Sequence, residues 1–184
     1  MCAWRARREN PVATLEDIKR VLKRMPFRTP LEKRDRALIA FAILTGARDG
    51  ALASFRLKHA DLAAQIVSQD AREVKTKGRK TFMTIFFPVG PEPLAIVEDY
   101  LRFLKDELSF GPEDPVFPST RVGHGIDRAY AAQGLSRRPW TTAAPIRSIF
   151  RAAFTTADLP YFNPHTFRKT LVRLGQRLRL TPEE

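Results

Sequence analysis

Apolar residues recur at helical spacing in several segments of the chain. A capping-box pattern at Thr14 precedes an apolar face of Leu15, Ile18, Leu22 and Met25, which predicts a first helix. Thr29-Pro30 opens a second helix that is apolar nearly all round between residues 38 and 44, and we expect this helix in the core and its end at Gly46. Further helices are expected at 91–108, at 145–154 and from Asn163 onward.

The pattern changes after Asp61, where β-branched and aromatic residues gather in shorter runs. Residues 62–67, 73–76 and 81–87 read as strands, and a polar turn at 77–80 joins the last two. Residues 111–139 form a long irregular connection in which we expect one short helix at 126–133. The predicted fold is therefore α+β: a mainly α-helical single domain with a small three-stranded antiparallel sheet.

Composition indicates a single folded domain with an anionic partner. The 184 residues are 43% hydrophobic, which suffices for a core, and 32 Lys and Arg against 20 Asp and Glu leave a net charge of +12. Such an excess favours a polyanion, although charge alone leaves DNA, RNA and an anionic membrane open. No apolar run of membrane-spanning length and no signal-peptide pattern is present, so we expect a cytoplasmic protein with no membrane contact.

Metal or disulfide chemistry is not expected from this sequence. Cys2 is the only cysteine, and His59, His124 and His165 lack ligand spacing. The candidate chemistry must therefore come from other side chains.

The segment Asn163-Pro164-His165-Thr166-Phe167-Arg168 has the pattern of a helix start that binds phosphate. Asn163 suits the N-cap and Pro164 the first helical position. Free backbone N–H groups there favour an anion, and His165 and Arg168, three residues apart, share one helix face. An ordinary surface helix carrying two polar residues is the alternative interpretation.

Arg48 lies where the buried second helix breaks at Gly46 and a short helix restarts. A guanidinium launched from a rigid corner offers phosphate a planar, bidentate contact. The alternative is an arginine paired with a nearby carboxylate.

Basic residues also gather at two other places. The predicted hairpin tip carries Lys75, Lys77, Arg79 and Lys80; it is either a solubilising edge or a finger that enters a DNA groove and delivers a proton from one lysine. The 111–139 connection and its flank mix basic and aromatic residues as nucleic-acid-facing loops do, although solvated loop charge explains them equally well; they include Arg121, His124, Tyr130, Arg137, Arg138 and Trp140.

In their order along the chain, these features resemble the catalytic domain of the tyrosine recombinases, the phage-integrase family. The resemblance rests on Thr45-Gly46-Ala47-Arg48, on Lys77 and on His165-Thr166-Phe167-Arg168, and it covers residues 14–184. The chain is basic from residue 1 to residue 8, so we expect residues 1–13 to be an arm or linker ahead of the catalytic domain that the resemblance implies.

The resemblance also implies a chemistry. One DNA strand is cut by a tyrosine through a 3′-phosphotyrosyl link, without metal or nucleotide cofactor. Arg48 and Arg168 would clamp the scissile phosphate, Lys77 would be the general acid with Lys75 as its rival, and His165 would bind the phosphate or assist proton transfer. Duplex DNA is the implied partner of the candidate DNA-binding residues Lys75, Arg79, Lys80, Arg121, Arg137, Arg138 and Lys169, and a tetramer on DNA is implied for the full-length protein.

The chain departs from the family pattern at several positions, and Lys169 stands where a histidine is common. Ala51 stands where the family often has a glutamate, so that carboxylate is absent or replaced by Asp49. Only sixteen residues follow Arg168, fewer than the nucleophilic tyrosine requires, and Thr181-Pro182-Glu183-Glu184 begins a helix that does not continue.

We therefore expect a catalytic core cut short before its nucleophile, inactive by itself. A naturally truncated, non-catalytic DNA-binding remnant is the alternative, and an RNA-binding or ribosome-associated basic domain is a third.

Overall fold

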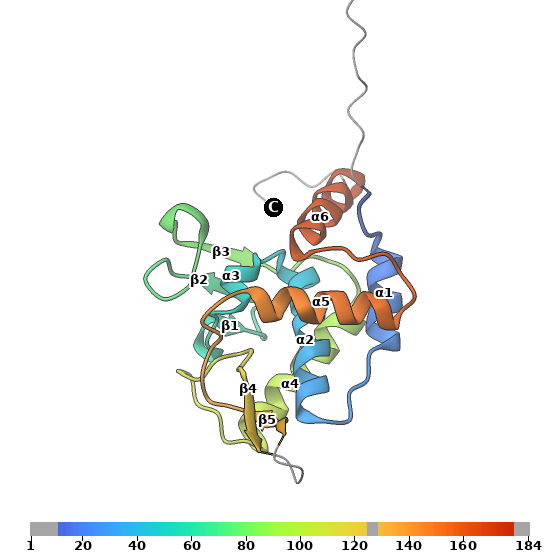
Figure 1. The fold of residues 1–184 in the computed structure, drawn as a ribbon. Helices are drawn as coiled ribbons and strands as arrows, with labels where there is room; N and C mark the ends of the chain where they lie inside the picture. The colour runs from blue at the N-terminus through green and yellow to red at the C-terminus, as the bar shows by residue number, and fades with distance from the viewer. Residues whose placement is uncertain (1–10, 125–128, 179–184) are drawn as a thin grey trace, which may run out of the picture.

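The computed structural model describes residues 11–124 and 129–178. Predictions for residues 1–10, 126–128 and 179–184 lie outside this part of the chain. The described helices are α1 (Leu15–Arg24), α2 (Pro30–Thr45), α3 (Asp49–Leu52), α4 (Pro91–Asp106), α5 (Ala144–Thr156) and α6 (Pro164–Leu178), as Figure 1 shows. Two short 3₁₀ turns, η1 (Leu57–His59) and η2 (Lys77–Arg79), complete the helical elements.

The strands form two separate antiparallel arrangements. One is a three-stranded sheet in the order β1–β2–β3, made of Ala60–Asp61, Ile66–Gln69 and Phe82–Ile85, with Ile66 opposite Ile85 and Gln69 opposite Phe82. The other is a hairpin of β4 (Thr120–His124) and β5 (Tyr130–Leu135). The predicted α+β class, helix-rich with a small three-stranded sheet, is confirmed.

Local capping explains where the first two helices begin and where α2 ends. The Thr14 hydroxyl accepts the Asp17 N–H at 3.1 Å and the Asp17 carboxylate accepts the Thr14 N–H at 2.9 Å, which is the predicted capping box. α2 begins after an equivalent box at Thr29 and ends at Gly46, whose φ of 58° is left-handed and favours glycine. Both predictions are confirmed.

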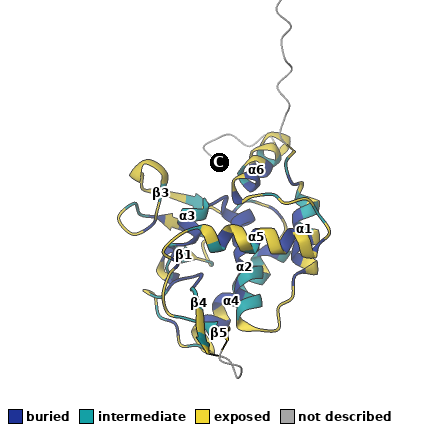
Figure 2. Cartoon of the chain, in the orientation of Figure 1, coloured by how far each residue is buried: buried dark blue, intermediate teal, exposed yellow. Residues whose placement is uncertain are grey.

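The core is built around α2, which runs through the middle of the molecule (Figure 1) and is almost entirely buried from residue 37 to residue 45 (Figure 2). Phe41 at its centre contacts the rings of Phe55, Phe86 and Phe117, with centroids 5.5, 6.1 and 5.4 Å away. Edge-to-face aromatic contacts add to the hydrophobic burial of α2. The C-terminal end of α2 is therefore rigid, and it fixes the position of the residues that follow it.

Three sequence predictions about the strands and loops are wrong in detail. Residues 73–76 are not a strand, because the carbonyl of Asp70 accepts the N–H groups of Glu73 and Val74 in a turn that the Asp70 side chain also caps. The strand predicted at 62–67 begins only at residue 66, because Asp61 accepts the Ala64 N–H and 62–65 form a turn.

The helix predicted at 126–133 is also wrong where the structure describes it. Residues 130–133 belong to β5 and pair with β4, with a register shift between Arg121 and Val122. Hydrogen bonds to the neighbouring strand β4 override the local helical pattern here.

Candidate nucleic-acid interface

The start of α6 is capped as its sequence predicts. The Asn163 side-chain oxygen accepts the N–H of Thr166 at 3.2 Å and its hydroxyl at 3.1 Å. Phe167 is fully buried against Phe150, with ring centroids 5.0 Å apart, and this contact orients the first turn. His165 is exposed in that turn.

Arg168 joins this helix to the end of α2. Its Nη1 donates to the Gly46 carbonyl oxygen at 2.6 Å, across 122 positions of sequence. A Cβ at Gly46 would lie 3.0 Å from Leu171 Cδ1 and 3.8 Å from Arg168 Cγ, so the close approach of α6 requires glycine as much as the backbone angle does. The end of α2 thus fixes the Arg168 guanidinium, and Arg48 follows the same helix end by two residues.

Arg48 is partly exposed and precedes α3 as its N-cap residue. Burial lowers the pKa of the Arg168 guanidinium, and the nearby charge of Arg48 lowers it further. We call Gly46, Arg48 and Arg168 the arginine corner. Among the described residues, no carboxylate pairs with either guanidinium, so the predicted alternative of an ion-paired Arg48 is not met.

The arginine corner carries positive charge that the described part of the protein does not neutralise. Two like charges held near each other by a rigid backbone repel, and an anion bound there would relieve the repulsion. A guanidinium can donate two parallel hydrogen bonds to phosphate oxygens. The corner is therefore suited to a phosphate group.

Asp49 does not face this corner. Its carboxylate accepts from Nε of Arg147 at 2.9 Å and from the Gly50 N–H at 2.9 Å, which ties α3 to α5. No sequence pattern pointed to Arg147, because its pair with Asp49 is formed across 98 residues.

Residues 70–81, here called the lysine loop, lie beside α3. Lys75 donates its N–H to Ser54 Oγ at 2.9 Å and its ammonium to the Thr141 carbonyl at 3.0 Å. Arg72 is exposed and pairs with Asp70 at 2.6 Å. The basic residues after Lys75 are exposed and, within the described chain, have no hydrogen-bond or ion-pair partner; they are Lys77, Arg79 and Lys80.

The first half of the lysine loop is anchored by a buried histidine. His59 Nδ1 accepts the Arg56 N–H at 3.0 Å, so its proton is on Nε2, which lies 2.8 Å from a Glu73 carboxylate oxygen. Hydrogen bonds from Lys58 and then from His59 lower the pKa of Glu73 to about 2. This anchor was not predicted from the sequence, because His59 was considered there only as a possible metal ligand.

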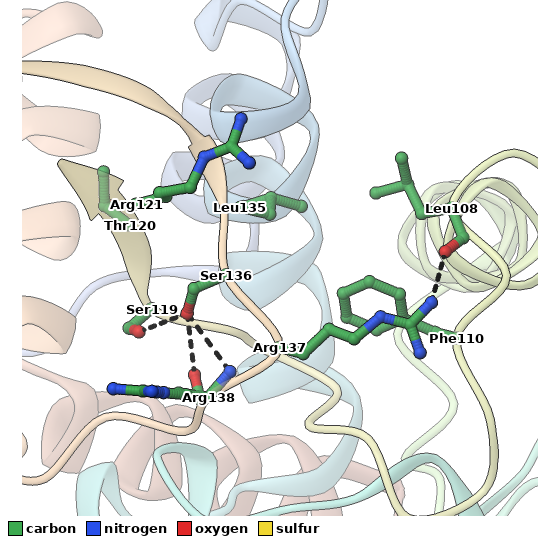
Figure 3. A pocket seen from close by; sticks show the side chains of 9 residues that line it. All are labelled: Leu108, Phe110, Ser119, Thr120, Arg121, Leu135, Ser136, Arg137 and Arg138. Carbon is green, nitrogen blue, oxygen red and sulfur yellow. Dashed lines mark hydrogen bonds between the residues drawn. The ribbon is translucent and has the colours of Figure 1, made fainter. Parts of the chain in front are cut away.

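Arg121, Arg137 and Arg138 lie elsewhere, around a hollow of about 610 Å³ that Figure 3 shows. Arg34, near the start of α2, donates to Pro118 and Thr120 beside this hollow. The arginine corner is at the other end of α2, about 18 Å from Arg34 along the helix, because 12 positions at 1.5 Å each separate Arg34 from Gly46. The structure therefore does not bring these three arginines to the corner.

The Arg137 guanidinium is held by hydrogen bonds within the protein. It donates to the carbonyls of Leu108 and Ser109, both at 2.9 Å, and pairs with Asp114 at 3.0 Å, so Figure 3 shows it directed toward Leu108. Arg121 makes one long contact, 3.4 Å, to the Gln133 carbonyl. Arg138 and, on α6, Lys169 have exposed side chains.

Within the described residues, no group of three or more His, Cys, Asp or Glu side chains is placed to hold a metal ion. In the same part of the chain, no helix has the length and apolar character needed to cross a membrane.

The sequence model of the phage integrase family matches residues 12–174. This chain belongs to the phage integrase family. The family comprises site-specific tyrosine recombinases, which carry out DNA recombination and DNA integration. A comparison with curated protein sequences finds no match.

Solved structures of tyrosine recombinases share the fold. XerA recombinase is 18% identical with a TM-score of 0.66, over 97% of this chain and 53% of that one. The lambda integrase catalytic core is 16% identical with a TM-score of 0.57, over 92% of this chain and 88% of that one. A lambda integrase dimer bound to a COC′ core site is 16% identical with a TM-score of 0.59, over 98% of this chain and 57% of that one. The chain thus spans about half the length of XerA.

Proposed function

We propose that this chain is the DNA-binding catalytic core of a site-specific tyrosine recombinase, which cuts and rejoins DNA through a 3′-phosphotyrosyl intermediate. The observation that carries the proposal is the arginine corner, where Arg48 and Arg168 lie near each other without a described carboxylate partner. A net charge of +12 supports a duplex DNA partner. Residues 14–184 would form the catalytic domain, and residues 1–13 a basic arm.

In the proposed reaction, the arginine corner holds the scissile phosphate. Arg48 and Arg168 donate to its non-bridging oxygens and stabilise the negative charge that develops on them in the transition state. The bond from Arg168 to the Gly46 carbonyl leaves its other guanidinium nitrogens for the phosphate.

The cleavage step needs one nucleophile and one proton donor. A tyrosine oxygen bonds to phosphorus while the bond to the 5′-oxygen breaks; His165 takes the tyrosine proton, and the 5′-oxygen receives a proton from Lys77. Lys77 is the preferred donor because its ammonium is exposed and has no partner within the described chain, whereas that of Lys75 donates to Thr141.

The nucleophile is proposed to come from sequence after residue 184. Tyr100 is buried, with its hydroxyl on the Val116 carbonyl, and Tyr130 lies on β5 at the hairpin far from the arginine corner. Tyr161 precedes Arg168 and stacks under Arg151. A full-length protein would then act as a tetramer on DNA.

A suicide DNA substrate tests the proposal. We expect no covalent adduct from the 184-residue chain and a 3′-phosphotyrosyl adduct from a version extended through a downstream tyrosine. Arg48→Ala and Arg168→Ala should each reduce the adduct at least 100-fold, while Arg102→Ala, an exposed arginine on α4, should leave it unchanged.

Other outcomes would decide against the proposal. Adduct formation that survives loss of either corner arginine would refute the role assignment. DNA binding without cleavage by the extended protein would favour the non-catalytic remnant. Equal binding of RNA and duplex DNA in a salt-controlled competition would favour the RNA-binding alternative.

A further inference from the structure

Ser54 connects α3 to the lysine loop through a single hydroxyl. Ser54 Oγ lies 3.0 Å from the Gly50 carbonyl and 3.2 Å from the Ala51 carbonyl, to which it donates, and it accepts the Lys75 N–H at 2.9 Å. The short helix that follows Arg48 is therefore linked to the backbone of the loop through the Ser54 hydroxyl.

Lys75 makes two further contacts that hold the same point. Its ammonium donates to the Thr141 carbonyl at 3.0 Å, in the segment that leads into α5. Its backbone also lies close to α3, because a Cβ at Gly50 would be 3.5 Å from the Lys75 carbonyl oxygen and 3.7 Å from the Lys75 Cβ. Ser54, Lys75 and Thr141 thus form a clip between α3, the lysine loop and the start of α5.

The clip lies at the boundary between an anchored and an outlying half of the loop. Before it, Val74 is 2% exposed and Glu73 is bound by Lys58 and His59. After it, residues 77–81 are exposed. Thr76, between the halves, buries its hydroxyl oxygen without a partner among the described residues, an unfavourable arrangement that its neighbours' contacts must hold in place.

We propose that Ser54 and Lys75 are positioning residues for proton delivery: the clip fixes the lysine loop against α3, so that Lys77 is presented at a constant place relative to Arg48. This inference rests on the proposed function, and it gives the two lysines different roles. Lys75 uses its ammonium to hold the loop, and Lys77 protonates the leaving 5′-oxygen. Loss of the clip slows that proton transfer but leaves phosphate binding by the arginine corner intact.

Two DNA substrates separate positioning from a general loss of structure. A 5′-bridging phosphorothiolate leaves as a thiolate, which needs no proton near neutral pH, whereas the ordinary 5′-oxygen does. In the version extended through a downstream tyrosine, we expect Ser54→Ala and Lys75→Met to cut the oxygen substrate about tenfold more slowly and the sulfur substrate at the wild-type rate. Lys77→Ala should slow cleavage of the oxygen substrate by more than tenfold and should also cut the sulfur substrate at the wild-type rate. Ser54→Thr, which keeps a hydroxyl, should cut the oxygen substrate at the wild-type rate.

The matched control is Ser148→Ala on α5. Ser148 is exposed and donates to the carbonyl four residues earlier, as Ser54 does, but it makes no bond to the lysine loop. Its rates on both substrates should equal those of the wild type. An equal fall on both substrates for Ser54→Ala, or no fall on either, overturns the proposal. Lys75 would be the general acid instead if Lys75→Met cut the oxygen substrate more slowly than Lys77→Ala does and cut the sulfur substrate at the wild-type rate.

Amide hydrogen exchange on the 184-residue chain tests the clip without any cleavage. Ser54→Ala should raise amide exchange at residues 75 and 76 at least tenfold, with α4 unchanged and with no effect of Ser148→Ala. Unchanged exchange refutes the clip. If the extended wild type cuts neither substrate, the proposed function fails and the catalytic role of the clip falls with it, while the exchange result still shows whether the clip holds the loop.

Discussion

Gly46→Ala is the most informative single change at the arginine corner, because it strains the backbone and crowds α6 at once. Gly46 has a φ of 58°, and its carbonyl holds Arg168. A methyl group there would lie 3.0 Å from Leu171 Cδ1, closer than an ordinary contact. The substitution therefore tests whether the end of α2 and the first turn of α6 are rigidly joined.

The expected loss of stability combines two terms. A non-glycine residue in the left-handed region costs about 1–2 kcal/mol, and overpacking a buried contact costs about 1–3 kcal/mol. Their sum, about 2–4 kcal/mol after partial relaxation of Leu171, should lower Tm by about 5–15 °C for a chain of this size. DNA binding should weaken as well, because the carbonyl that positions Arg168 must shift.

Urea unfolding of wild type and variant, with the m-value compared, measures the change. Gly78→Ala is the control, since Gly78 has a similar φ of 69° but nothing within 4 Å of the added carbon. It should show at most the backbone term, about 1–2 kcal/mol. If both variants lose the same amount, crowding against Leu171 does not occur and the close packing of α6 on Gly46 is refuted.

Three further outcomes are expected. Arg147→Ala should reduce the free energy of unfolding by no more than about 1 kcal/mol in urea, because its pair with Asp49 is partly exposed; a larger loss would mean that this pair holds α3 in place. Glu73 has its folded pKa depressed to about 2 from a usual 4.5, so its contribution to stability is present above pH 4.5 and is lost as the pH falls toward 2; in urea unfolding, Glu73→Gln should flatten the pH dependence in this window, and an unchanged slope would contradict the anchor. Arg137→Ala should lower Tm without changing the salt dependence of DNA binding, whereas Arg138→Ala should leave Tm unchanged; the reverse pattern would show that Arg137 binds DNA.

The sequence by itself determined where α1, α2 and α6 begin and where α2 ends. Thr14, Thr29 and Asn163 cap their helices, and Gly46 ends α2, because each device acts through hydrogen bonds or backbone angles within about four residues. The family resemblance followed from the same local motifs, since a short motif can be read without knowing what it contacts.

The partners of the charged side chains were decided only by the tertiary structure. Arg137 and Arg138 are adjacent and were alike in sequence, yet one is bound to Leu108 and Asp114 and the other has an exposed side chain. Lys75 and Lys77 likewise differ through distant partners of Lys75: its ammonium donates to the Thr141 carbonyl, 66 residues later, and its backbone N–H donates to Ser54, 21 residues earlier.

The strand predicted at 73–76 failed for a related reason. Local β-propensity there is weaker than the turn that Asp70 forms and the anchor that Glu73 makes with η1. Backbone capping depends on a few neighbouring residues, but a side chain's partner depends on which distant segments the packed core brings within 3 Å, and no local pattern in the sequence records that.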